Sequence, residues 1–248
     1  MVITAKGFSM ISKYRFDDNI FWGIGMENIQ LADAEVNEEE IRSASNMIYT
    51  PKPVYDFFKR VFDVVAALIC IIVGTPFYII IALGIIIGDP GNPIFVQERV
   101  GLDGKHYKCL KWRTMYKDAD ARKAELEKQN EYDSVHFKMS NDPRVTKFGR
   151  FLRKTSLDET PQFINILLND MSFIGPRPFI PKEQDQLPSD RLVVKPGLSC
   201  YWQITNTTKM STEEQLELDY KYIRERSVLT DIKLVFKTVM VIFKGKNC

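Results

Sequence analysis

The sequence predicts a mostly helical α+β protein with a re-entrant membrane helix at residues 55–88, a small cytoplasmic domain at residues 89–248 and interfacial amphipathic helices. Three observations predict this class: a long apolar run interrupted by a proline, basic residues on both sides of that run, and a strand–turn–strand pattern soon after it. Residues 1–50 form a separate N-terminal segment, which carries no repeat and no motif that indicates its role.

The apolar run VFDVVAALICIIVGTPFYIIIALGIII occupies residues 61–87, and Asp63 is its only charged residue. A helix needs about 20 apolar residues to cross the hydrocarbon core of a bilayer, and this run is long enough. A buried helix of a soluble protein is the alternative, but such helices rarely stay apolar on every side over this length. We therefore expect the run to insert into a membrane.

The break in the middle of the run predicts a bend. Proline removes one backbone hydrogen bond and clashes with the preceding turn, so a kink is expected at Thr75-Pro76. Cytoplasmic flanks of membrane segments carry excess Lys and Arg, and here both flanks do. These residues are Lys52, Lys59 and Arg60 before the run and Arg99, Lys105 and Lys108 after it. A re-entrant helix satisfies both flanks and is our prediction, whereas the alternative, a crossing helix, satisfies one.

Two further elements complete the predicted architecture. PIFVQERVG and HYKCLKWRTM are strand-like, and Asp103-Gly104 between them is a good hairpin signal. One face of the second strand carries alternating residues that are typical of a solvated edge strand: Tyr107, Cys109, Lys111 and Arg113. The stretch DIKLVFKTVMVIFKGK at residues 231–246 suits a helix in the membrane interface with snorkelling lysines, and docking onto a protein core explains it equally well.

The stretch KTSLDETPQ at residues 154–162 places two adjacent carboxylates before an apolar run. Ser156 and Glu159 have the spacing of a capping box at a helix start, and Pro161 is tolerated in a first turn. Asp158 and Glu159 are also ordinary in a first turn, where they meet the positive end of the helix dipole. From these residues alone, capping is the better interpretation.

Four longer stretches together closely resemble the bacterial sugar transferases, which are monotopic phosphoglycosyl transferases. They are KRVFDVVAALICIIVGTPF, PIFVQERVGLDGKHYKCLKWRTM, DPRVTKFGRFLRKTSLDETPQFINILLNDMSFIGPRP and VKPGLSCYWQI, in that order, and the likeness covers about residues 55–245. The resemblance implies transfer of a sugar 1-phosphate from a UDP-sugar to undecaprenyl phosphate, with release of UMP, as the first step of surface glycan assembly. It also implies a bacterial inner membrane location, a catalytic domain on the cytoplasmic face, contact with membrane lipid, and a divalent cation, normally magnesium.

The resemblance also assigns roles to particular residues. Asp158 and Glu159 match the catalytic Asp-Glu pair, with Asp158 also a candidate metal ligand, and Thr75-Pro76 matches the break in the membrane helix. Arg153 in RKTSLDE and Arg177 in GPRP match the phosphate-binding arginines. One departure is Cys200, which stands where the family has a glycine, in a stretch that shapes the nucleotide or sugar pocket.

The chemistry explains why these residue types occur together. A helix N-terminus lowers the pKa of a nearby carboxylate, so Asp158 is expected to stay ionised, as a nucleophile must. Attack on a diphosphate then meets like-charge repulsion, which Glu159 increases. Arg153, Arg177 and a magnesium ion are expected to offset that repulsion. Ser156 and Glu159 can still cap while Asp158 reacts.

Composition narrows the alternatives. The chain has 248 residues, a net charge of +2, four separated cysteines and two histidines, so no zinc site is expected. Acids are interleaved with bases, which argues against a nucleic-acid partner. A membrane-anchored module that binds a nucleotide or phospholipid without turnover remains as the alternative function. The residues indicate neither the sugar, nor the glycan pathway, nor the oligomeric state.

Overall fold

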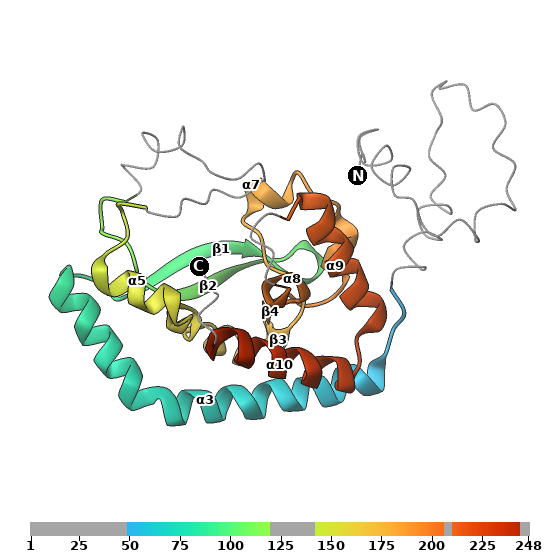
Figure 1. Cartoon of the computed structure of the whole chain (residues 1–248). Coiled ribbons are helices and arrows are strands. Elements are labelled where there is room, and N and C mark those ends of the chain that lie inside the picture. Colours follow the sequence, from blue (N-terminus) through green and yellow to red (C-terminus); the bar gives the residue numbers. More distant parts are fainter. Residues whose placement is uncertain (1–48, 120–141, 206–209, 244–248) are drawn as a thin grey trace, which may run out of the picture. The chain divides into compact units, whose positions relative to one another are not determined.

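The computed structural model describes residues 49–119, 142–205 and 210–243 (Figure 1). Contacts divide the chain into the units Met1–Asn46 and Met47–Cys248, and the second holds every described residue. Nearly all of the predicted N-terminal segment 1–50 therefore lies outside the description.

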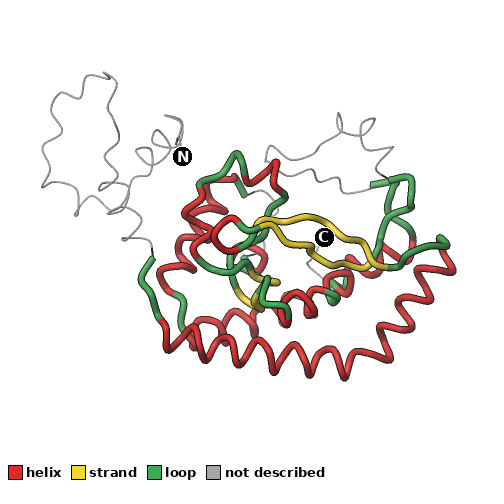
Figure 2. The backbone as a smooth tube through the Cα atoms, turned by 180° about the vertical axis from the view of Figure 1, so that it is seen from behind, coloured by secondary structure: helices red, strands yellow, loops and turns green. Residues whose placement is uncertain are grey.

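The second unit is α+β and mostly helical, as predicted, with two small sheets (Figure 2). With η for 3-10 helices, its elements are α3 (Pro53–Gly88), β1 (Ile94–Val100), η1 (Leu102–Gly104), β2 (His106–Trp112), α5 (Lys147–Lys154), η3 (Leu157–Glu159), α6 (Gln162–Leu167), β3 (Ser172–Ile174), α7 (Pro181–Gln184), η4 (Ser189–Val193), β4 (Gly197–Ser199), α8 (Tyr201–Ile204), α9 (Thr212–Glu225) and α10 (Val228–Phe243).

The apolar run forms one continuous helix, α3, which contains Pro76 (Figure 1). Figure 1 shows this helix bending without a break. Two side chains near the proline donate to carbonyl groups that precede it: the Thr75 hydroxyl to the Ile71 carbonyl at 2.7 Å, and the Tyr78 hydroxyl to the Cys70 carbonyl at 3.0 Å. These bonds add contacts across the part of the helix where proline removes a backbone N–H.

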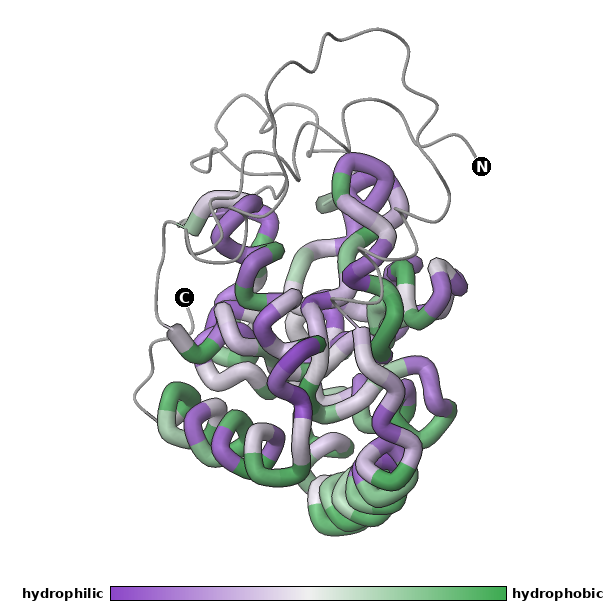
Figure 3. The backbone as a smooth tube through the Cα atoms, turned by 90° about the vertical axis from the view of Figure 1, so that its right-hand side faces the viewer, coloured by the Kyte–Doolittle hydropathy of each residue, from purple (hydrophilic) through white to green (hydrophobic). Residues whose placement is uncertain are grey.

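Helix α3 has a narrow protein-facing stripe and a broad exposed apolar surface. Its buried residues are Asp63, Ala67, Ile81 and Ile85, and only 11% of its most apolar window is buried. In the part of the chain that the structure describes, α3 is the one helix long and apolar enough to cross a bilayer. Figure 3 shows it at the bottom of the domain, mostly in the green of apolar residues.

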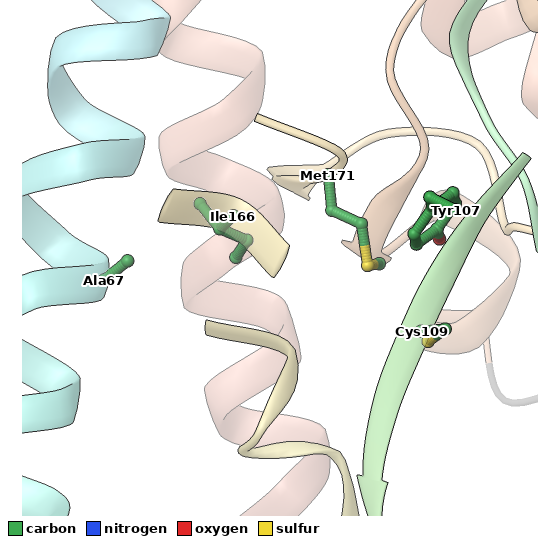
Figure 4. Packing of buried hydrophobic residues seen from close by; sticks show 5 residues of the cluster. All are labelled: Ala67, Tyr107, Cys109, Ile166 and Met171. Carbon is green, nitrogen blue, oxygen red and sulfur yellow. The ribbon is translucent and has the colours of Figure 1, made fainter. Parts of the chain in front are cut away.

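Both halves of α3 pack on the same domain. In the first half, Ala67 packs in a cluster with Ile166, Met171, Tyr107 and Cys109, and Figure 4 shows Met171 between Ile166 and Tyr107. The second half packs through a different cluster, formed by Ile81, Ile85, Trp112 and Leu152. The helix therefore lies along the domain instead of leaving it.

The predicted hairpin is confirmed. Strands β1 and β2 pair antiparallel, from Ile94 opposite Trp112 to Val100 opposite His106. Asp103 and Gly104 have φ angles of 55° and 73°, the left-handed conformation that this dipeptide tolerates. The expectation of a solvated edge face is wrong, because Tyr107 and Cys109 are 9% and 1% exposed and point into the core.

The C-terminal stretch forms α10, for which docking on the protein is confirmed and the membrane-interface role stays a prediction. Leu234 is buried in a cluster with Ile174 and Tyr222, so one face docks on the protein. Another face leaves Ile232, Phe236 and other large apolar side chains exposed. Residues 244–246 of the predicted stretch lie outside the described residues.

Gly149 in α5 supplies a test of the packing. A Cβ there would lie 2.8 Å from the Thr114 Cα and closer still to the carbonyl group of Thr114, which is backbone and cannot rotate away. We expect Gly149→Ala to lower the free energy of unfolding by about 1–3 kcal/mol. Urea unfolding in detergent measures it, with Gly88→Ala as the control, because a Cβ at Gly88 meets nothing within 4 Å. Equal stability of the two variants would contradict this packing.

Candidate active site

The two adjacent carboxylates lie on a 3-10 turn, not in the first turn of an α-helix. Ser156 has a left-handed φ of 56° and its side chain makes no capping hydrogen bond, so the predicted capping box with Glu159 is wrong. Helix α6 begins only after Pro161. Long-range contacts hold the turn instead: Leu157 packs on the Trp112 cluster, and the Trp112 indole N–H donates to the Thr160 hydroxyl at 2.9 Å.

Glu159 is bound to a lysine of the hairpin. The Lys111 ammonium donates to Glu159 Oε1 at 2.7 Å, and both side chains are about three-quarters buried. Burial raises the pKa of Glu159, but the charges of Lys111, Arg177 and Arg99 outweigh it and hold that pKa below its ordinary value. Glu159 is therefore a firmly ionised carboxylate.

Asp158 lies beside this pair but behaves differently. No ion pair reaches its carboxylate from any described residue. Burial and the neighbouring charge of Glu159 raise the pKa of Asp158 to about 6, against the opposing charges of Lys111 and Arg153. The expected depression of this pKa by a helix N-terminus is wrong, because there is no α-helix start here and burial dominates. Asp158 is still ionised at neutral pH.

The two predicted arginines lie near the carboxylates and belong to different parts of the fold. Arg153 is in the last turn of α5, where its Nε donates to the Thr114 hydroxyl at 2.9 Å. Burial lowers the pKa of Arg153, and the charge of Asp158 acts against that change. Arg177 follows β3, and its guanidinium lies 4.9 Å from the centre of the Trp202 ring.

The main chain of Arg177 is clamped by a buried ion pair. Arg191 and Asp219 are bonded at 2.7 Å, with side chains 1% and 3% exposed. Arg191 also donates to the Arg177 carbonyl at 2.5 Å, and the Arg177 N–H donates to Asp219. Together with Pro176 and Pro178, these bonds fix where the Arg177 side chain begins.

A pocket beside the turn collects three cationic side chains. Arg99, Lys111 and Arg177 line it together with Glu159, and its cavity volume is about 20 Å³. Gly197, Leu198, Gln162 and Gln203 form other parts of its wall. Three cations against one anion make this pocket suited to a phosphate-bearing ligand.

The structure brings four predicted site residues into one neighbourhood, with Glu159 and Arg177 on the pocket and Asp158 and Arg153 beside it. Thr75 and Pro76 lie apart, on α3. Arg99 and Lys111 are site residues that the sequence did not lead us to predict. The register of the hairpin could have identified them. Arg99 pairs with Tyr107 and Phe95 with Lys111, so alternation puts both cations on the inward face.

Magnesium stays a prediction, with Asp158 as its candidate protein ligand. No group of three or more His, Cys, Asp or Glu side chains occurs among the described residues. Magnesium is commonly held by one or two carboxylates together with substrate phosphates and water, so a dense protein cage is not required. Because Glu159 is already in an ion pair with Lys111, Asp158 is the carboxylate left for such an ion.

Cys200 does not line this pocket. It is buried at the start of α8, and its N–H donates to Gln203 Oε1 at 3.1 Å. Burial raises the pKa of its thiol to about 12, so the group is a neutral thiol at physiological pH. Gly197, Leu198 and Gln203 provide the pocket wall on either side of it.

The fold and site define a small α+β domain on a long apolar helix, with a carboxylate pair beside a cationic pocket. Residues 54–245 match the family described as bacterial sugar transferase, and the chain belongs to that family.

Three relatives illustrate the match. The chain is 39% identical over 198 residues to a UDP-galactose-lipid carrier transferase of Erwinia amylovora, covering 76% of this chain and 41% of that protein. It is 40% identical over 213 residues to the UDP-glucose:undecaprenyl-phosphate glucose-1-phosphate transferase of Escherichia coli, covering 78% and 43%. It is 34% identical over 212 residues to the exopolysaccharide production protein ExoY of Rhizobium meliloti, covering 80% and 93%. The chain thus spans about four-tenths of the first two relatives and nearly all of the third.

The charge balance can be tested by removing Lys111. Its charge lowers the pKa of both Asp158 and Glu159, so Lys111→Met should raise both. Carbon-13 NMR titration of labelled carboxyl groups measures this shift. Lys108→Met is the control, because Lys108 is exposed and points to the opposite face of β2. An unchanged Asp158 titration in Lys111→Met would contradict the assigned electrostatics.

Proposed function

We propose that this protein transfers a sugar 1-phosphate from a UDP-sugar to undecaprenyl phosphate, releasing UMP, to initiate a bacterial surface glycan such as an exopolysaccharide, capsule, O-antigen or glycoprotein glycan. The observation that carries the proposal is an ionised Asp158 with no ion-pair partner among the described residues, beside a pocket lined by three cations. Similarity to a lipid-carrier transferase of Erwinia amylovora and an undecaprenyl-phosphate transferase of Escherichia coli supports the same reaction.

The proposed reaction has two displacements at one phosphorus atom. A carboxylate oxygen of Asp158 attacks the phosphorus that carries the sugar, the bond from that phosphorus to the bridging oxygen breaks, and UMP leaves with the electron pair. The product is an acyl phosphate that joins the sugar to Asp158. A phosphate oxygen of undecaprenyl phosphate then attacks the same phosphorus, and the Asp158 carboxylate is released unchanged.

The pocket explains how an anion can attack a diphosphate. Arg99, Lys111 and Arg177 place positive charge where negative charge accumulates, in a partly buried site where such interactions are stronger than in water. Arginine adds a planar fork that can bind two phosphate oxygens at once. Magnesium held by Asp158 and the diphosphate would supply further positive charge.

Glu159 and Arg153 have supporting roles in this proposal. Glu159 holds Lys111 at the pocket wall through the 2.7 Å contact, and its charge keeps the pKa of Asp158 high. A carboxylate with a pKa near 6 is a better nucleophile than one with an ordinary pKa, and it is still ionised at neutral pH. Arg153 partly balances the charge of Asp158 and is held by Thr114.

The proposed location is the inner membrane, with α3 re-entrant and the catalytic domain on the cytoplasmic face. The packing of α3 supports this arrangement. Ala67 and Ile85, in the two halves of the helix, both pack against the same domain, which also includes Trp112. A crossing helix would carry one half to the other side of the bilayer and lose those contacts.

Transfer through Asp158 can be tested by trapping the intermediate. Wild-type protein given UDP-sugar without acceptor lipid should release up to one UMP per site and retain the sugar phosphate, detected by mass spectrometry on the peptide that contains Asp158. Hydroxylamine should remove it, as expected of an acyl phosphate. Asp158→Asn should abolish turnover while the protein stays folded. If that variant transfers at near wild-type rate, the two-step reaction is wrong; if neither protein turns over with acceptor present, the binding module without turnover is favoured.

The raised pKa of Asp158 predicts an acid limb in the rate profile. Below pH 6 the carboxylate becomes protonated, so kcat/KM for the UDP-sugar should fall about tenfold per pH unit and level off above pH 6. In Glu159→Gln, loss of the neighbouring negative charge should move the limb of the residual activity to lower pH. If the acid limb stays at the same pH in Glu159→Gln, the group that causes the limb is not Asp158.

The re-entrant arrangement predicts that both flanks of α3 share one side. Single cysteines introduced at Ser45 and Lys105 should both resist an impermeant thiol reagent in intact spheroplasts and both react after lysis. Labelling of one site from outside would establish a crossing helix. Pro76→Ala should shift the population toward crossing, because it restores the missing backbone hydrogen bond and straightens the helix.

A further inference from the structure

A second cavity joins a charged rim to an apolar wall, and it shares no lining residue with the pocket at Glu159. It has a volume of about 260 Å³ and lies where the C-terminal end of α3 meets the start of α5 and the loop after β2. A dry cavity of about 150 Å³ already admits a benzene-sized ligand, so this one has room for a small polar group and several carbons.

The charged rim has one cation in excess. The Arg113 guanidinium donates to the Asp89 carbonyl and lies 3.6 Å from the Asp89 carboxylate, so its charge is largely balanced. Lys147 also lines the cavity, is exposed, and makes no hydrogen bond or ion pair through its ammonium with any residue in the described ranges. The rim is therefore complementary to an anion.

Part of the cavity wall is apolar, and exposed apolar side chains lie on other faces of the same turns of α3. Ile85 and Phe148 line the cavity, while Leu83 and Ile87 are 53% and 81% exposed. Helix α3 ends at Gly88, and Asp89 is the first charged residue after it. With α3 in the membrane, as proposed above, the cavity lies at the depth where lipid headgroups begin.

We propose that this cavity binds the headgroup region of an anionic phospholipid, with the lipid phosphate near Lys147 and the first acyl carbons against Ile85 and Phe148. A free phosphate ion would use the rim and leave the apolar wall uncovered. A zwitterionic lipid would cover the wall but bring no net charge to Lys147. The site rests on the membrane position of α3 and does not depend on the transfer reaction at Asp158.

The full-length protein in detergent can be titrated with dioctanoyl phosphatidylglycerol, dioctanoyl phosphatidylcholine and inorganic phosphate, with binding followed by native mass spectrometry and thermal unfolding. We expect the anionic lipid to bind roughly fivefold tighter than the zwitterionic one, from one basic residue near an anionic headgroup. Lys147→Gln should remove that preference. Lys154→Gln, an exposed lysine on α5 outside the cavity, should keep it.

A second pair of variants tests the apolar wall. A Cβ at Gly84 would lie 2.8 Å from the Phe148 ring, so Gly84→Ala must displace this ring of the cavity wall and should weaken binding of the anionic lipid. Gly104→Ala adds a methyl group in open space outside the cavity and should not. Equal binding of the two lipids, or equal behaviour of Lys147→Gln and Lys154→Gln, would overturn the site. If inorganic phosphate competes with the lipid and stabilises the protein equally, the cavity is an ion site. That result would overturn the lipid assignment.

Discussion

The contact between Lys111 and Glu159 joins the two parts of the molecule on which the candidate site depends. It ties β2 of the hairpin to the turn η3, and Asp158 lies on that turn. It places a cation on the pocket wall, and it keeps Glu159 ionised beside Asp158. Positioning and charge in this site therefore come from one ion pair, and burial strengthens its effect.

The hairpin can reach the turn because α3 supports both from below. Trp112 at the end of β2 packs on Ile81 and Ile85 of α3 and also bonds to Thr160, which follows the turn. The helix is exposed on much of its remaining surface, where Ile72, Phe77 and Ile87 are 64% exposed or more. The geometry of the carboxylate pair thus depends on the same helix that is long and apolar enough to anchor the domain in a membrane.

The elements that were predictable from sequence are those that local patterns determine. The apolar run gave α3 within a few residues, and Asp103-Gly104 gave the hairpin because both residues accept a positive φ. The turn at Asp158 could not be predicted this way. Its lead-in matches a capping box, but Leu157 and Thr160 are held by Trp112, a residue distant in the sequence, and these contacts override the local preference.

The raised pKa of Asp158 and the role of Lys111 could not be predicted, for the same reason. A carboxylate at a helix start is expected to have a lowered pKa, whereas burial among α5, β2 and the turn raises that of Asp158. Lys111 looked like a solvated strand residue because alternation alone does not say which face is covered. The hairpin register with Arg99 and the burial of Cys109 together would have identified the inward face.

Isotope exchange tests whether Asp158 accepts the phosphosugar before the lipid does. Radiolabelled UMP is incubated with the protein and unlabelled UDP-sugar, with all polyprenyl phosphate removed, and label in the UDP-sugar is measured over time. Label should appear in the UDP-sugar, because the acyl phosphate can be attacked by UMP in the reverse of its formation. Absence of exchange from a preparation that transfers phosphosugar once acceptor lipid is restored would contradict it, and would favour direct transfer between the two substrates.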